Sequence, residues 1–189
     1  MGLDLDEWIF GKVAKYLKKK KDKTNDSLPQ KVALEEIKPR LILLARAISG
    51  KAIEIYPAEE EGGYKGNNYF LPIEFSEMPT WETNLSFYFF RLLYLSVQQE
   101  KDINWSYPED DVDLSRKMAL QSAEEILPIL YEQFPVAAEL HKKFYDYFMQ
   151  QAENSEDADF SMLYGKWMQK QKAEQQNDPL KNFDEKVQK

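Results

Sequence analysis

The residues of this 189-residue sequence that could carry chemistry gather in two places, a glycine-rich stretch and an apolar helical stretch. Three of the seven glycines lie within residues 62–66, in the run Glu61-Gly62-Gly63-Tyr64-Lys65-Gly66-Asn67-Asn68. Glycines gather where the backbone needs a positive φ or where another group approaches closely. The run is not a phosphate-binding P-loop, because it lacks the G-x-x-x-x-G-K-[ST] spacing and does not open a helix. Lys65 could meet an anion or an acidic partner, or it could be a solvated side chain of a hairpin loop.

The second place is Arg91, which lies inside the aromatic run 87–95. An unpaired buried charge is very costly, so Arg91 should have a partner. The candidate partners are carboxylates close to the predicted hairpin: Glu54, Glu59 and Glu74. Pairing of Arg91 with Glu54 would be a structural ion pair that ties the hairpin to the helix. Alternatively, Arg91, Glu54 and Tyr94 would line a ligand pocket.

The remaining residues do not form a recognisable catalytic or metal-binding pattern. His141 is the one histidine, so an H-E-x-x-H zinc motif cannot be formed, and no G-x-S-x-G motif is present. We expect His141 to be a surface or packing residue. Five residues fall at ligand positions of an EF-hand calcium loop: Asp102, Asn104, Ser106, Asp110 and Asp113. The match is incomplete, because Tyr107 stands where that loop needs glycine and its last position is aspartate instead of glutamate. We therefore expect no metal, no cofactor and no enzymatic activity.

Composition restricts the class of protein further. The net charge of −8 argues against nucleic-acid binding, because neutralising phosphates needs a basic surface. A hydrophobic fraction of 43% with 14% aromatic residues is typical of a packed domain. The absence of cysteine, of a signal peptide and of a membrane-length apolar run predicts a cytoplasmic protein without a membrane span. Lysines at 15, 18–21 and 23 could contact an anionic membrane or be the solvated end of a helix.

Hydrophobic periodicity indicates the elements that must position these residues. Helices are expected at 3–20, 31–49, 81–100, 113–133 and 135–154, with a last helix after Asp159 that carries Phe160, Leu163, Tyr164, Trp167 and Met168 on one side. Thr80 should cap the 81–100 helix, which is apolar nearly all round and should be buried. Strands at 52–56 and 68–75 should form a hairpin closed by the glycine loop.

The predicted fold is therefore mainly α, a bundle-like domain of about six helices with one small β-hairpin between the second and third helices. We expect a single helical domain over residues 1–175, followed by a polar tail at 176–189.

Several segments resemble a known family. Leu41–Ala47, Ile53–Ile55, Glu61–Pro72, Asn84–Gln99 and Phe134–Ala138 are similar to the N-terminal region of the nitric oxide reductase activation protein NorD family. The resemblance covers residues 34–145, and the glycine loop and the aromatic helix are its more specific parts. Proteins of that family carry a C-terminal von Willebrand factor A domain. The D-x-S-x-S metal motif of that domain is absent here, because Asp113-Leu114-Ser115 continues with Arg116-Lys117.

The resemblance implies a function and partners. Proteins similar to NorD work with a MoxR-type AAA+ ATPase to activate or mature a client, such as the membrane enzyme nitric oxide reductase. We therefore expect a non-enzymatic adapter that contacts the ATPase or the client through an exposed loop. The partner-binding residues would be Gly63, Tyr64, Lys65, Gly66, Asn67 and Asn68. The alternatives are a small-ligand-binding or enzymatic helical domain with a pocket near Arg91, and a structural domain that oligomerises through its last helix.

Overall fold

The computed structural model describes residues 31–104, 111–152 and 158–168. Within these ranges the helices are α2 (Leu34–Ser49), α3 (Trp81–Glu100), α4 (Val112–Gln133), α5 (Pro135–Gln151) and α6 (Ser161–Tyr164). The strands are β1 (Val32–Ala33), β2 (Glu54–Ala58), β3 (Gly63–Lys65), β4 (Asn68–Pro72) and β5 (Glu74–Phe75). The mainly helical fold class is confirmed for this part of the chain. The helix expected at 3–20 and the tail at 176–189 lie outside the described residues.

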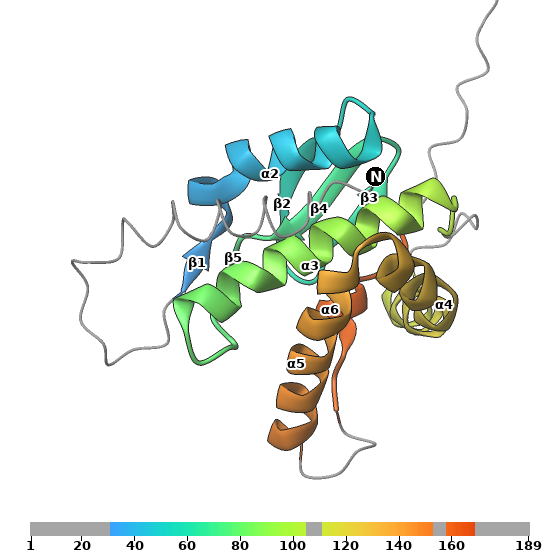
Figure 1. Ribbon diagram of the computed structural model, residues 1–189. Helices are drawn as coiled ribbons and strands as arrows, with labels where there is room; N and C mark the ends of the chain where they lie inside the picture. Colours follow the sequence, from blue (N-terminus) through green and yellow to red (C-terminus); the bar gives the residue numbers. More distant parts are fainter. Residues whose placement is uncertain (1–30, 105–110, 153–157, 169–189) are drawn as a thin grey trace, which may run out of the picture.

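Helix α3 forms the centre of the fold. Thr80 caps it as predicted: its hydroxyl accepts from the Thr83 backbone N–H, and Thr83 reciprocates as a capping box. Residues 83–85 and 87–99 are all buried, which confirms the prediction of a buried helix. Figure 1 shows α3 crossing the middle of the molecule, with α2 and the strands on one side and α4 and α5 on the other. Aromatic packing continues this core, since Phe87 stacks on Phe75 and meets the edge of Phe144.

The strand pairing differs from the prediction. A three-stranded sheet has the order β2-β4-β3, and β2 runs parallel to β4, with Glu54 opposite Asn68. The predicted hairpin between these two strands is therefore wrong. The actual hairpin joins β3 and β4, because a tight turn with Gly66 at φ 59° brings Lys65 opposite Asn68. Strand β2 then pairs with the other edge of β4. A separate antiparallel pair joins β1 to β5.

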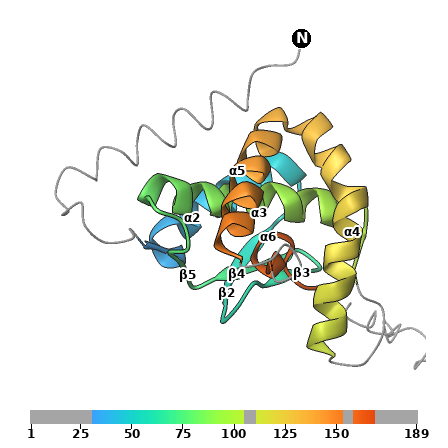
Figure 2. The same cartoon turned by 90° about the horizontal axis from the view of Figure 1, so that it is seen from below.

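The C-terminal half also departs from the prediction in its helix ends. The cap of α4 is Asp111, whose carboxylate accepts from the Leu114 N–H, so the helix begins at Val112, one residue before the predicted start. The predicted last helix is a single turn, because Gly165 takes φ 72° and ψ −153°, a conformation that ends a helix. Residues 165–168 continue without helical structure. We call them the strap, because they are hydrogen-bonded to the glycine loop, to α4 and to the segment that follows α3. In Figure 2 the view from below shows α6 close to α3 and α4, the two helices that it contacts.

Candidate functional site

Each glycine of the loop meets a different structural demand. Gly62 has φ 66°, and a Cβ there would lie 2.1 Å from the carbonyl oxygen of Phe70. A Cβ on Gly63 would lie 2.3 Å from the carbonyl oxygen of Lys166, in the strap. Gly66 needs only its positive φ, since nothing lies within 4 Å of its Cβ position. Two of these glycines therefore serve close packing, and the third forms the turn.

The glycine loop is less exposed than the sequence predicts. Residues 61–64 are buried, and Tyr64 is only 4% exposed. Gly66 and Asn67 are exposed, while Lys65 and Asn68 are half-buried. Of the six predicted partner-binding residues, Gly63 and Tyr64 are thus buried, because the strap covers Gly63 and the Tyr64 side chain is almost fully enclosed. The accessible part is residues 65–68, which we call the β3–β4 turn.

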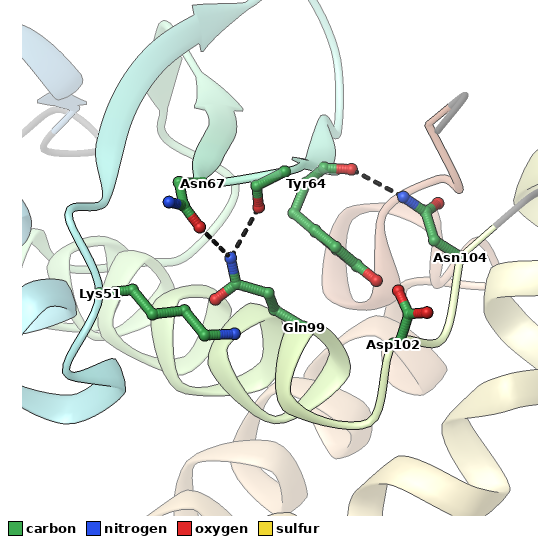
Figure 3. A pocket seen from close by; sticks show the side chains of 7 residues that line it. Lys51, Tyr64, Asn67, Gln99, Asp102 and Asn104 are labelled. Carbon is green, nitrogen blue, oxygen red and sulfur yellow. Dashed lines mark hydrogen bonds between the residues drawn. The ribbon is translucent and has the colours of Figure 1, made fainter. Parts of the chain in front are cut away.

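The last turn of α3 fixes the β3–β4 turn from below. The Gln99 side chain donates from Nε2 to the Gly66 carbonyl at 2.6 Å and to Asn67 Oδ1 at 3.2 Å. Its Oε1 accepts from the Tyr69 hydroxyl at 3.1 Å. On the neighbouring side, Asn104 Nδ2 donates to the Tyr64 carbonyl at 3.0 Å (Figure 3). Two of these four bonds hold the turn itself, and the other two hold Tyr64 and Tyr69, the residues on either side of it.

A recess of about 460 Å³ lies beside the β3–β4 turn. Figure 3 shows its lining residues, which come from three separate segments of the chain: Lys51, Tyr64, Gly66, Asn67, Gln99, Asp102 and Asn104. The Tyr64 hydroxyl is buried and has no hydrogen-bond partner among the described residues. Burial raises the pKa of Tyr64, and the negative charge of Asp102 raises it further, so the phenol stays neutral and can donate a hydrogen bond. The recess thus contains charged and neutral polar groups that a ligand could contact.

Arg91 is buried completely, but the structure does not bring it together with Glu54. Its Nη1 donates to the Leu163 carbonyl at 2.8 Å, and its Nη2 donates to the Glu61 carbonyl at 3.2 Å. Glu54 instead pairs with Arg46, which lies on α2. Burial lowers the pKa of Arg91 to about 10, and the nearby Tyr94 and Glu61 oppose this shift. Arg91 therefore ties α3 to the glycine loop and to α6 through backbone carbonyls.

Glu61 is a buried charge that the sequence analysis missed. Its side chain is 2% exposed, and its carboxylate accepts from Arg116 Nε at 2.9 Å and Nη2 at 3.2 Å. Lys166 Nζ lies 4.0 Å from the same carboxylate. This cluster joins the glycine loop to α4 and to the strap. A glutamate beside two glycines was the available signal, but nothing in the sequence identified Arg116 as its partner.

His141 is a packing residue in the structure. Its Nδ1 lies 2.6 Å from the Tyr131 hydroxyl, its Nε2 lies 2.9 Å from the Tyr164 hydroxyl, and its ring stacks on Phe90. Burial lowers the pKa of His141, which favours the neutral imidazole. In the described parts of the chain, no group of three acidic or histidine side chains is placed to hold a metal ion. The middle of the EF-hand-like register, residues 105–110, lies outside them.

No protein-family model, curated protein or solved structure matches this chain. The resemblance to the NorD family therefore remains a prediction from the sequence segments quoted above. Within the described ranges, no helix has the length and apolar character needed to cross a bilayer.

Proposed function

We propose that this chain is a non-enzymatic adapter that binds a MoxR-type AAA+ ATPase and acts in the activation or maturation of a client such as nitric oxide reductase. The identities of the ATPase and of the client come from the family resemblance. We place the contact surface at the β3–β4 turn, residues 65–68, which is the accessible part of the predicted surface. The observation that carries the proposal is the combination of exposure and rigidity in this turn.

Rigidity matters because binding costs free energy when a loop must become ordered. Gln99 already holds Gly66 and Asn67 in place from the buried helix beneath them. Lys65 and Asn67 then present an ammonium and a carboxamide on a fixed backbone, which suits an acidic or polar patch on a partner. Functional residues are often placed this way, on loops that a rigid scaffold positions.

Affinity measurements with surface variants test this contact surface. The double variant Lys65→Ala/Asn67→Ala should bind the ATPase about 5- to 30-fold more weakly, the size expected when one or two useful interface side chains are truncated. Lys143→Ala is the matched control, because Lys143 is exposed on α5. Tyr64 is left unchanged because it is buried. Equal affinities for the wild type and the double variant would show that the turn is not the contact surface.

The alternative of a ligand pocket near Arg91 gains no support from the recess in Figure 3. Its lining does not include Arg91, Glu54 or Tyr94. The oligomerising alternative is not favoured either, because α6 buries Leu163 and Tyr164 in the core of the same chain.

A further inference from the structure

We propose that the strap, residues 165–168, is a displaceable cover over a groove that binds an extended peptide segment of a partner protein. The peptide would take the place of the strap along the outer edge of β3 and would set a lysine or arginine side chain against the Glu61 carboxylate. This inference goes beyond the adapter function and does not depend on the identity of the ATPase.

The first observation is that β3 is an edge strand. The order β2-β4-β3 leaves its second edge without a neighbouring strand among the described residues. The Gly62 carbonyl, just before β3, accepts from the Lys166 N–H at 2.8 Å. The Tyr64 carbonyl accepts from Asn104 Nδ2 at 3.0 Å (Figure 3), and Asn104 Oδ1 accepts from the Met168 N–H at 2.8 Å. The strap thus runs alongside β3 in the same direction, where an added strand would lie.

The second observation is that the strap is held mainly through its main chain. Besides the two N–H groups of residues 166 and 168, the Trp167 carbonyl accepts from the Ser115 hydroxyl, and the Trp167 N–H donates to the Ser115 carbonyl at 3.4 Å. Because these bonds use no side chain of the strap, the backbone of another extended peptide could make them. Peptides that add to a sheet edge gain affinity from main-chain hydrogen bonds in this way.

The groove keeps room for such a backbone at Gly63. A Cβ on this residue would lie 2.3 Å from the carbonyl oxygen of Lys166. Glycine in a strand is typical of a place where another backbone approaches closely. The groove is therefore shaped for a main chain and not for a bulky side chain.

The charges at the groove indicate the kind of peptide. The Glu61 carboxylate, whose side chain is 2% exposed, lies 4.0 Å from Lys166 Nζ. Arg116 contacts the same carboxylate, and it also contacts Glu60 and Asp113. When the strap leaves, these three carboxylates face one arginine, so negative charge is in excess. A lysine or arginine of the peptide would balance it, as charge complementarity between partners requires.

The strap can leave while α6 stays in place. Two of its contacts are long, namely the 3.4 Å hydrogen bond of Trp167 and the 4.0 Å ion pair of Lys166. Residues 166–168 are only half-buried. Gly165, with φ 72°, precedes them and can absorb a change of backbone direction. Before this hinge, the Leu163 carbonyl remains bonded to the buried Arg91. A segment with so few contacts opens at a small cost in free energy.

Fluorescence anisotropy of a labelled peptide with the full chain tests the proposal. The probe has the five-residue sequence of positions 164–168 and is blocked at both ends. Lys166→Glu should bind it about tenfold more tightly than the wild type, because repulsion from Glu60 and Glu61 opens the strap and raises the binding-competent fraction. Lys143→Glu makes the same charge reversal at an exposed position of α5 and should bind like the wild type. A probe with glutamate in place of its lysine should bind Lys166→Glu about tenfold more weakly or worse.

Gly63→Ala distinguishes the groove from any other binding site. It displaces the strap but also fills the groove, so it should bind the probe about tenfold more weakly than Lys166→Glu does. In the wild type, bound peptide should speed hydrogen exchange of the Lys166 and Met168 amides but not of the Leu92 amide in α3. The proposal is overturned if Lys166→Glu gains no affinity, if Gly63→Ala binds as tightly as Lys166→Glu, if the glutamate probe binds equally well, or if the strap amides keep their protection. None of these outcomes involves the ATPase, so each leaves the adapter proposal standing.

Discussion

Replacement of Gly63 by alanine should detach the strap from the glycine loop. The added Cβ would lie 2.3 Å from the carbonyl oxygen of Lys166 and 3.0 Å from Met168 Cγ. Because the nearer atom belongs to the backbone, no change of side-chain rotamer relieves the clash. The strap must move by about 1 Å or more to restore an ordinary van der Waals distance.

The cost follows from the hydrogen bonds that this movement breaks. The Lys166 N–H donates to the Gly62 carbonyl at 2.8 Å, and the Met168 N–H donates to Asn104 Oδ1 at 2.8 Å. The Ser115 hydroxyl donates to the Trp167 carbonyl. At about 1 kcal/mol net for each bond, loss of all three lowers the free energy of unfolding by about 3 kcal/mol.

Gly66→Ala is the matched control, because it adds the same methyl group in open space. Its only penalty is the left-handed backbone at φ 59°, which costs about 1 kcal/mol. Urea denaturation followed by circular dichroism measures both costs, and hydrogen exchange of the Lys166 and Met168 amides reports whether the strap is docked. If Gly63→Ala is no more destabilising than Gly66→Ala, and both strap amides stay protected, this reasoning is refuted.

Three further predictions follow from buried polar groups. Arg116→Ala should lower the free energy of unfolding by about 2 kcal/mol in urea denaturation, because it strips the partner from the buried Glu61 carboxylate; a loss below about 0.5 kcal/mol would contradict this. Because burial depresses the folded-state pKa of His141 below its usual 6.5, the unfolded chain takes up the proton first, so stability is complete above that value and falls as the pH drops below it. His141→Gln should flatten this fall in denaturation curves measured from pH 7 to pH 5, and an unchanged slope would assign the fall to other groups. Tyr64→Phe should leave the melting temperature of the free protein unchanged or higher, because the hydroxyl has no partner among the described residues; a loss as large as that of Gly63→Ala would show that it has one.

The sequence predicts best what depends on local pattern. A stretch that is apolar from Phe87 to Val97 except at Arg91 and Ser96, and that follows a Pro-Thr pair, is sufficient to place α3, its cap and its burial. Three clustered glycines indicate that the loop is organised, although they do not say what approaches it. The structure supplies that answer, because the carbonyl oxygens next to Gly62 and Gly63 belong to Phe70 and Lys166.

Long-range pairing could not be predicted from one sequence. The parallel pairing of β2 with β4 depends on β3 taking the opposite edge of β4, and the hydrophobic alternation of a strand is the same in either arrangement. Arg91 was expected to find a carboxylate, but it donates to a carbonyl 72 residues away. The recess combines three segments of the chain, and its two charged residues, Lys51 and Asp102, are not related by any helix or strand period.

The most direct test of the adapter proposal is co-purification of the full chain with the MoxR-type ATPase of the same organism, with and without ATP. The proposal predicts association that depends on nucleotide and that is lost with Lys65→Ala/Asn67→Ala but kept with Lys143→Ala. Absence of association with an ATPase shown to be active would contradict it.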